Sequence, residues 1–348
     1  MPQRPSTRST SVVHALDFST WKQNAVRQCF PGARIEFIDN AADAPAGSML
    51  AVWGMASLPA EVEARVKVLR IEDGFLRSVG LGADLIRPMS WVIDGRGIYY
   101  DATRASDLEY LLANTVFDSA LVQRASLLRR RIVAERLTKY NVGLSGWRRP
   151  AGPGKVILVP GQVESDASLA YGAPALRANI ALLQAVRKAN PAAHVVYKPH
   201  PDVVARLRAK GAGEDEAQRW CDQVVADADM ADLLMAVDEV HVLTSLTGFE
   251  ALMRDKPVTC YGQPFYSGWG LTIDLTPNPR RGRRLALDEL VAVALIEYPL
   301  YLSRETDELL TPEQALDELV TWRARTGGTL PWWRKIFRMV LRRIVGVR

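Results

Sequence analysis

Cysteine and histidine are scarce in this sequence, which contains three cysteines and four histidines in 348 residues. Cys29, Cys221 and Cys260 form no CxxC pair and have no neighbouring histidine, so neither a disulfide framework nor a structural zinc site is expected. No stretch reaches the roughly 18 apolar residues of a membrane-spanning helix, and the amino-terminal MPQRPSTRSTSVVHALDF lacks the apolar centre of a signal peptide. These absences predict a protein of the reducing cytoplasm that is neither secreted nor integral to a membrane.

A strong excess of one charge is also missing, because 44 Lys and Arg stand against 39 Asp and Glu, for a formal net charge of +5. A small positive charge fits an anionic partner such as a nucleic acid, a phosphorylated metabolite or an acidic membrane surface. The basic residues gather at the chain end and are not interleaved with base-stacking aromatics on a recognisable module. Nucleic-acid binding is therefore not expected.

Short apolar segments alternate with helical patterns in two halves of the chain, which predicts an α/β fold. The predicted strands of the first half are RIEFID (34–39), SMLAVWG (48–54), part of EVEARVKVLRIEDGF (61–75) and SWVIDG (90–95). Those of the second half are KVILVPG (155–161), AHVVYKPHP (193–201), VDEVHVLTS (237–245) and PVTCYG (257–262). Helices are predicted over about 105–139, 173–190 and 247–256.

The segment NVGLSGWRRPAGPGK, rich in Gly, Pro and Arg, is the best candidate for a linker between the halves. We expect two Rossmann-like domains, over 1–150 and 151–320, that face one another across a cleft. A separate tail would then cover 321–348. In open parallel sheets ligands bind beyond the carboxyl ends of the strands, so the loops after the predicted strands are the places to look for a site.

Two of these loops suit an anion. His200 follows a predicted strand and is held in extended backbone between Pro199 and Pro201. The stretch TSLTGFEAL (244–252) places hydroxyl groups and a glycine at an expected helix start, where free backbone N–H groups favour a phosphate. Taken alone, each has a simpler interpretation: a structural histidine, and a helix capped by its hydroxyl residues. The spacing of a dinucleotide or Walker loop is absent.

Two further loops carry pairs of acids. Glu72 and Asp73 lie in IEDGFLRS, and Glu164 and Asp166 lie in PGQVESDAS. If the halves face one another, these two pairs of acids lie close together across the cleft. A retaining glycosyl transfer uses two carboxyl groups, one as nucleophile and one as acid/base. The alternative is that Asp73 starts a turn and Asp166 caps a helix.

The loop YGQPFYSGWG (261–270) combines aromatics with glycines. Tyr266 and Trp269 in it are candidates to offer ring faces to a sugar, although a buried structural loop has a similar composition.

The carboxyl end, PWWRKIFRMVLRRIVGVR (331–348), is basic on one side of a helical wheel and apolar on the other. This pattern predicts an in-plane helix on an anionic inner-membrane surface, and the alternative is a tail helix docked on its own protein.

Taken together and in order, RIEDGFLRS, VPGQVESDAS, YKPHPD, LTSLTGFEAL and KPVTCYGQPFYSGWG resemble the KpsC-type capsule polysaccharide proteins, which are retaining β-Kdo glycosyltransferases. The resemblance covers about residues 48–305. It implies a glycosyltransferase-B-like pair of domains, CMP-Kdo as the donor substrate, no other cofactor and no metal, and a glycolipid or Kdo-terminated acceptor. The layout is also similar to that of bacterial sialyltransferases. Members of the family usually hold two such modules in tandem, whereas this chain has one.

The resemblance implies a role for each motif residue. Asp166 would be the nucleophile, with Glu164 as its alternative, and Glu72 or Asp73 would be the acid/base. Residues implied to hold the CMP moiety or the Kdo carboxylate are His200, Pro201, Thr244, Ser245, Thr247, Gly248, Glu250, Gln162, Arg77 and Lys198. Among these, Glu250 is the candidate for the ribose, and Arg77 and Lys198 are the candidates for the Kdo carboxylate.

Two rival functions remain open. One is an inverting CMP-sugar transferase in which Asp73 is the single base and the 164–166 loop is structural. The other is a non-catalytic assembly protein that binds a nucleotide sugar or a polysaccharide. The anomeric configuration of a product distinguishes the inverting transferase from a retaining one. The absence of any product would identify the non-catalytic protein.

Overall fold

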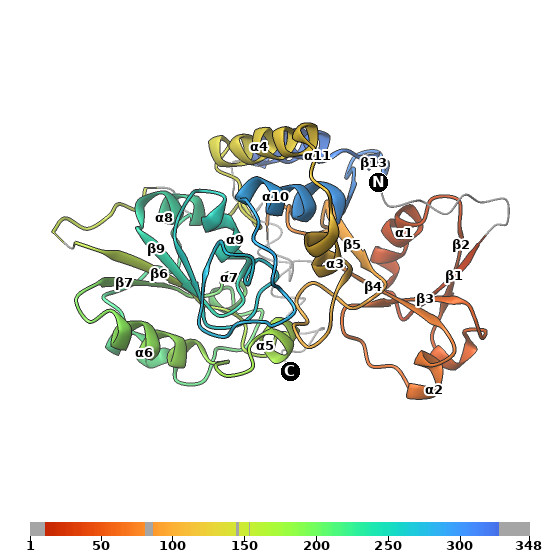
Figure 1. Cartoon of the computed structure of the whole chain (residues 1–348), viewed down its shortest axis with the longest axis horizontal. Helices are drawn as coiled ribbons and strands as arrows, with labels where there is room; N and C mark the ends of the chain where they lie inside the picture. The colour runs from red at the N-terminus through yellow and green to blue at the C-terminus, as the bar shows by residue number, and fades with distance from the viewer. Residues whose placement is uncertain (1–10, 81–85, 144–145, 153, 327–348) are drawn as a thin grey trace.

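The computed structural model describes residues 11–80, 86–143, 146–152 and 154–326, which form two β-sheets with helices packed around them. Figure 1 shows the sheet of strands β1 to β5 in one lobe and the sheet of β6 to β9 in the other, with several helices between them. The α/β class that the alternation predicts is confirmed.

The first sheet is mixed, with the strand order β13-β12-β5-β4-β3-β1-β2. Its strands are β1 (Val12–Leu16), β2 (Arg34–Ile38), β3 (Met49–Trp53), β4 (Lys67–Asp73), β5 (Ser90–Asp94), β12 (Leu300–Leu302) and β13 (Leu309–Leu310). Strands β2, β1, β3 and β4 are parallel, and β5, β12 and β13 are joined by antiparallel pairing. Strand β1 lies between β2 and β3, and the sequence pattern did not predict it.

The second sheet is parallel throughout, with the order β11-β10-β9-β6-β7-β8. Its strands are β6 (Val156–Pro160), β7 (His194–Lys198), β8 (Gln223–Val224), β9 (Glu239–Val242), β10 (Val258–Cys260) and β11 (Ile273–Asp274). Every residue of β6, from Val156 to Pro160, is buried, as expected for a strand that is covered on both faces. The loops after β6, β7, β9 and β10 therefore meet at one edge of this sheet.

Helices cover both sheets. Those of the first half of the chain are α1 (Thr20–Cys29), α2 (Ala60–Glu63), α3 (Asp107–Asn114) and α4 (Ser119–Ala134), with the 3₁₀ turn η1 (Ala41–Asp43). Those of the second half are α5 (Ala167–Gly172), α6 (Asn179–Ala189), α7 (Pro201–Val204), η3 (Glu214–Arg219), α8 (Met230–Ala236), α9 (Leu246–Leu252), α10 (Leu287–Val291), the π-helical η4 (Ala292–Glu297) and α11 (Pro312–Thr326).

The single helix predicted over about 105–139 is two helices in the structure. Helix α3 ends at Asn114, and the Asp118 side chain accepts a hydrogen bond from the Leu121 N–H to start α4. Such a cap satisfies one of the N–H groups that a helix start leaves free. The chain therefore turns between the two helices.

The carboxyl part of the described chain returns to the first sheet. Strand β12 pairs with β5, and α11 lies beside α4, where Arg124 donates two hydrogen bonds to Glu313. Figure 1 shows α11 and α4 side by side along one face of the molecule. Residues 300–326 thus belong with the first half, which differs from the predicted domain boundary at residue 320.

One aromatic cluster joins the motif loops of both halves. Phe75, which follows β4, stacks on Phe265 at 4.5 Å between ring centroids and packs against Phe249 of α9 at 6.2 Å. Tyr99 meets Phe75 edge to face at 4.9 Å. Because Phe75, Phe249 and Phe265 are buried and come from three of the five motifs, these motifs contribute to the packing between the sheets as well as to any site.

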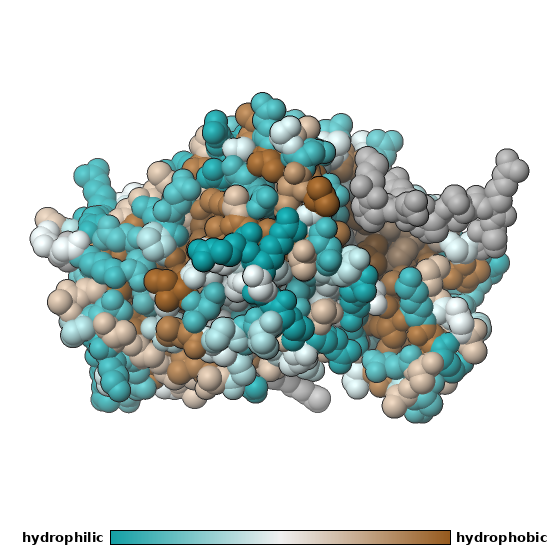
Figure 2. Space-filling model, viewed as in Figure 1, coloured by the Kyte–Doolittle hydropathy of each residue, from teal (hydrophilic) through white to brown (hydrophobic). Residues whose placement is uncertain are grey.

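Figure 2 shows hydrophilic residues over most of the viewed face, with hydrophobic residues scattered among them. In the described ranges, no helix is long and apolar enough to cross a membrane. The predicted membrane-contacting helix at 331–348 lies outside the described residues, so it stays a prediction.

Candidate active site

Asp73 and Arg77 form an ion pair at the end of β4. Arg77 Nε donates to Asp73 Oδ2 over 2.5 Å, and its other nitrogens donate to the Ser78 hydroxyl and the Ile86 carbonyl. Arg77 is buried, with 4% of its surface exposed. Its guanidinium is therefore engaged by its own loop, and the Asp73 carboxylate carries a neutralising partner.

Glu72 lies beside this pair, and no Lys or Arg of the described residues forms an ion pair with it. It accepts hydrogen bonds from the Asp73 N–H at 3.0 Å and from the Tyr100 hydroxyl at 3.3 Å. Burial, with help from the negative charge of Asp73, raises the pKa of Glu72 to about 7, against the opposing charges of Lys22 and Lys139. A carboxyl group with such a pKa exchanges protons near neutral pH, as an acid/base group requires.

Gly54 packs directly against the Glu72 and Tyr100 side chains, where a side chain would not fit. Its φ of +50° is rarely adopted by other residues, and a Cβ there would lie 3.0 Å from Glu72 Oε2 and 2.9 Å from the Tyr100 hydroxyl oxygen.

Glu164 and Asp166, the two acids after β6, lie in different environments. Glu164 accepts hydrogen bonds from the Asn179 N–H at 2.8 Å and the Ala212 N–H at 3.1 Å, so it holds the start of α6 against a neighbouring loop. Asp166 is the N-cap residue of α5, yet its side chain makes no capping hydrogen bond. Burial raises the pKa of Asp166, opposed by the charges of Arg208 and Lys139. Both acids are half-buried, and within the described part of the chain only Asp166 lacks a side-chain hydrogen bond.

His200 follows β7 and caps α7, whose first residue is Pro201. Its Nδ1 accepts a hydrogen bond from the Asp202 N–H at 3.2 Å, so the proton of the neutral ring resides on Nε2. Burial and the nearby cations, chiefly Lys139, lower the pKa of His200 to about 3. The ring is therefore a neutral donor at physiological pH. The His200 and Tyr140 rings are nearly perpendicular, with their centroids 6.1 Å apart.

Lys198, at the end of β7, points to a different neighbour. Its ammonium donates to the Ala226 carbonyl at 3.1 Å, and burial lowers its pKa to about 8.

Gln162 and Thr244 bind each other across the loops after β6 and β9. The Gln162 amide accepts from the Thr244 N–H at 2.9 Å and donates to the Thr244 hydroxyl at 3.0 Å. Ser245 caps α9 by accepting from the Thr247 N–H at 3.3 Å. The sheet thus brings the predicted phosphate residues Thr244, Ser245 and Thr247 to the edge that also carries His200.

Gly248, in the first turn of α9, is required by the packing of Tyr266. A Cβ on Gly248 would lie 2.7 Å from Tyr266 Cζ, and the Tyr266 hydroxyl donates to the Ser245 carbonyl. We expect Gly248→Ala to lower the free energy of unfolding by about 1–3 kcal/mol, because the buried Tyr266 ring must shift. Thermal or urea unfolding measures this loss. Gly282→Ala is the control: its Cβ would meet no atom within 4 Å, and an equal loss there would contradict the explanation.

Tyr266 and Trp269 do not offer their rings to a ligand, which corrects the sequence interpretation. Both side chains are fully buried. Tyr266 packs on Phe249 and Phe265, and the Trp269 indole N–H donates to the Phe265 carbonyl at 2.8 Å. The apolar surroundings of the loop, which belong to both halves, decide this burial.

Glu250 contacts the segment around Lys139, which connects the two halves. It is 5% exposed and accepts a hydrogen bond from the Lys139 N–H, while Arg254 donates to the Leu137 carbonyl at 2.8 Å. The same segment also receives hydrogen bonds from the first half, including Gly80 N–H to the Tyr140 carbonyl at 2.8 Å. Glu250 is thus engaged in holding the connecting segment.

Lys139 is the central residue that the sequence analysis missed. Its charge acts on Glu72, Asp166 and His200, so Lys139 lies within electrostatic range of an acid from each half and of the histidine. Arg208, also not predicted, acts on Asp166 and His200. The only sequence signal for Lys139 was its place at the end of the long helical pattern, directly before the predicted linker.

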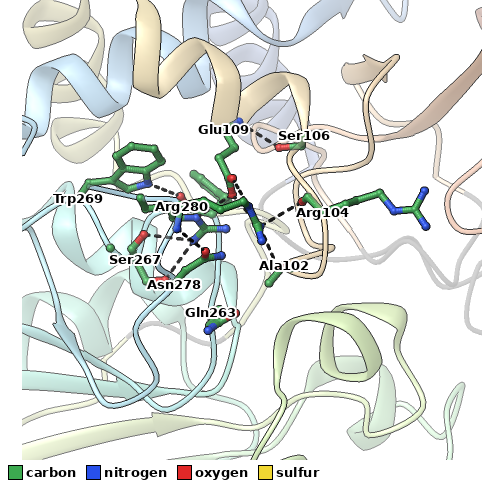
Figure 3. Close-up of polar contacts among 12 residues, drawn as sticks. Ala102, Arg104, Ser106, Glu109, Gln263, Ser267, Trp269, Asn278 and Arg280 are labelled. Atoms are coloured by element: carbon green, nitrogen blue, oxygen red, sulfur yellow. Dashed lines mark hydrogen bonds and ion pairs between the residues drawn. The ribbon is translucent and has the colours of Figure 1, made fainter. Parts of the chain in front are cut away.

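A polar cluster around Glu109 ties the two halves together beside the site. Figure 3 shows Arg280 reaching Glu109 and the carbonyl groups of Ala102 and Arg104. The more deeply buried Arg281 donates to Glu109 at 3.0 Å. Both arginines follow the second sheet, whereas Glu109 belongs to α3 of the first half, so this cluster helps set the position of one half against the other.

Within the described ranges, no group of three or more His, Cys, Asp or Glu side chains is placed to hold a metal ion.

The family model described as "Capsule polysaccharide biosynthesis protein" matches residues 55–149 and 148–301. The capsule polysaccharide modification protein LipA of Neisseria meningitidis serogroup B is 42% identical over 328 residues, which are 91% of this chain and 47% of LipA. The lipopolysaccharide-processing protein LpsZ of Rhizobium meliloti is 44% identical over 257 residues, which are 72% of this chain and 58% of LpsZ. The chain thus spans about half the length of the curated relatives it matches.

Two solved structures from Thermosulfurimonas dismutans KpsC have the same fold. The β-Kdo 2,7 transferase matches with a TM-score of 0.75 and 39% sequence identity, covering 90% of this chain and 100% of that one. The β-Kdo 2,4 transferase matches with a TM-score of 0.78 and 31% identity, covering 90% of this chain and 99% of that one.

Proposed function

The chain belongs to the capsule polysaccharide biosynthesis protein family, and from this membership and its site we propose that it is a retaining β-Kdo glycosyltransferase. It would move Kdo from CMP-Kdo to a glycolipid or Kdo-terminated acceptor in the making of a surface polysaccharide. The similarity to two KpsC Kdo transferases supports Kdo as the transferred sugar. We further propose a glycosyltransferase-B-like arrangement, in which the second half binds the donor and the first half presents the acceptor.

The single observation that carries the proposal is the contrast between Asp166 and Glu164. Glu164 is held by two backbone N–H groups, whereas the Asp166 carboxylate has no hydrogen bond among the described residues. Hydrogen bonds to a carboxylate stabilise its charge and reduce its reactivity as a nucleophile. We therefore assign the nucleophile to Asp166. Its raised pKa supports this assignment, because a more basic carboxylate is a better nucleophile.

The donor's anions would be held by neutral and cationic donors around Asp166. His200, with its Nε2 proton, would donate to the CMP phosphate together with the Ser245 loop. We assign the Kdo carboxylate to Lys139 and Arg208. Arg77 and Lys198 are less suited, because Arg77 is paired with Asp73 and Lys198 donates to a backbone carbonyl.

The reaction would proceed in two displacements. In the first, an Asp166 oxygen forms a bond to the anomeric carbon as the bond to the CMP phosphate oxygen breaks, and CMP leaves with both electrons of that bond. In the second, Glu72 takes the proton of an acceptor hydroxyl, whose oxygen displaces Asp166 from the anomeric carbon. Two inversions return the β configuration of the donor.

Asp73 is less suited than Glu72 to be the base, because Arg77 holds its charge. This also weakens the case for an inverting transferase that depends on Asp73 alone.

Incubation with CMP-Kdo and synthetic Kdo-terminated or lipid acceptors, with the product analysed by NMR, tests the function. A β-linked product supports the proposal, and an inverted α-linked product would assign the chain to the inverting class. Release of no CMP with any acceptor would favour a non-catalytic binding protein. We expect transfer to persist in EDTA, since the proposed charge stabilisation comes from side chains.

We expect His200→Ala to weaken CMP binding about tenfold or more, the value of one hydrogen bond to a charged group. Isothermal titration with CMP measures the change. His194→Ala is a matched control, because His194 begins the same strand at the opposite end of the sheet. Unchanged CMP affinity in His200→Ala would leave the histidine with only its capping role.

A further inference from the structure

Lys22 lies in the first turn of α1, the helix that follows β1. Its ammonium nitrogen is 2.9 Å from the ring centroid of Trp53 and 5.2 Å from that of Trp21. Trp53 ends β3, and Glu72 lies near the end of the adjacent β4. The carboxyl ends of three parallel strands, β1, β3 and β4, thus bring Lys22 to the same edge of the sheet as Glu72.

The Lys22 ammonium is held in place by an aromatic ring and not by a carboxylate. Trp53 itself is fixed by edge contacts with Phe18 at 6.3 Å and Trp91 at 5.8 Å. No ion pair of Lys22 with a carboxylate is found in the part of the chain that the structure describes. An ammonium over an indole face is attracted by the ring but keeps hydrogen-bonding capacity toward a ligand.

The charge of Lys22 acts on Glu72 and Asp73, yet each already has closer partners. Asp73 is paired with Arg77, and Glu72 accepts from Tyr100 and from a backbone N–H. Burial lowers the pKa of Lys22 to about 8, so the ammonium is still charged at neutral pH.

We propose that Lys22 binds an anionic group of the acceptor, either the carboxylate of an acidic sugar or the phosphate of a glycolipid. The inference rests on the proposed function, because that function makes Glu72 the base that receives the acceptor hydroxyl. Trp21, whose side chain is 37% exposed, is placed beside the ammonium to contact the acceptor sugar ring. Lys22 is thereby a specificity-determining residue for an acidic acceptor.

The simplest rival is that Lys22 only adjusts the protonation of Glu72. The two roles differ in their dependence on the acceptor's charge. If Lys22 binds the acceptor anion, its removal affects charged acceptors and spares neutral ones. If it acts only on Glu72, its removal affects charged and neutral acceptors alike.

Ligand-observed NMR titrations of the full chain at pH 7, without CMP-Kdo, test the inference. The probes are the methyl β-glycoside of Kdo, the methyl ester of that glycoside, and glycerophosphoglycerol. We expect Lys22→Met to weaken binding of at least one anionic probe about tenfold, and Lys22→Arg to keep most of it. The neutral ester should bind wild type and Lys22→Met equally. Lys67→Met is the matched control, since Lys67 is exposed at the opposite end of β4.

The anionic probe whose binding depends on Lys22 shows whether the anion is the carboxylate of an acidic sugar or the phosphate of a glycolipid. Absence of binding by both anionic probes, equal binding by wild type and Lys22→Met, or an equal loss for the ester would each overturn the inference. These outcomes are distinct from failure of the proposed function, which is read from Kdo transfer to the synthetic acceptors. Lys22-dependent binding in a protein that transfers no Kdo would support the anion site and contradict the transferase function.

Discussion

Asp166→Ala is expected to lower Kdo transfer about a thousandfold or more, the scale on which loss of a nucleophile acts. The fold should survive, because the Asp166 side chain makes no capping hydrogen bond whose loss would destabilise α5. In wild type, intact-mass measurement with CMP-Kdo and no acceptor should show one added Kdo, and peptide mapping should locate it in the 164–166 loop. Near-normal transfer by Asp166→Ala would show that this nucleophile is wrong.

Glu164→Gln is the matched control for this experiment. Glu164 holds the Asn179 and Ala212 N–H groups, so the amide should reduce stability by about 1–3 kcal/mol while leaving transfer within about tenfold. If Glu164→Gln abolishes the adduct and Asp166→Ala does not, the two acids exchange roles.

Glu72→Gln is expected to lower transfer about 10²–10⁴-fold, the range for loss of a general base. The first displacement expels a phosphate, which needs no proton from Glu72, so CMP release and adduct formation should persist. The variant should accordingly accumulate the Asp166 adduct when acceptor is present. Loss of both adduct formation and transfer would contradict the assignment of Asp166 as the nucleophile and Glu72 as the base.

The pH dependence offers a second measurement on Glu72. Its raised pKa of about 7 predicts that wild-type transfer increases as pH rises through 7, because the base must be deprotonated. The groups that act on it are Asp73, Tyr100, Lys22 and Lys139. The same raised pKa destabilises the folded state as pH rises from the ordinary value of 4.5 to about 7. Glu72→Gln should therefore unfold at a higher temperature than wild type at pH 8 and at a similar one at pH 4.

The connecting segment gives these assignments a structural setting. Lys139 N–H donates to Glu250 of the second half, and the Lys139 carbonyl accepts from Ser78 of the first half at 3.3 Å. The residue that influences Asp166, His200 and Glu72 electrostatically is thus anchored on both sides.

Local sequence patterns determined the α/β class, most strand positions and the loops that carry the site. Apolar runs, caps and prolines act on near neighbours in the chain, and parallel pairing then brings the strand ends to one edge. This is why the loops of His200, Thr244 and Asp166 could be predicted, without a structure, to follow neighbouring strands of one sheet. Strand β1 is as long as the predicted β2 and β3, but the polar residues before it obscured its pattern, and the antiparallel return of β12 depends on a distant strand.

Only the tertiary structure distinguished residues of the same type from one another. Asp166 and Glu164 are two positions apart, yet α6 and the loop at Ala212 provide N–H groups to Glu164 alone. The burial of Tyr266 likewise depends on Phe249 and Phe265, which no local pattern relates to it. Charge, burial and hydrogen bonding in a site are set by neighbours from distant parts of the chain. The sequence by itself therefore determined which side chains are available, and the packing of the two halves decided which of them are buried or held by hydrogen bonds.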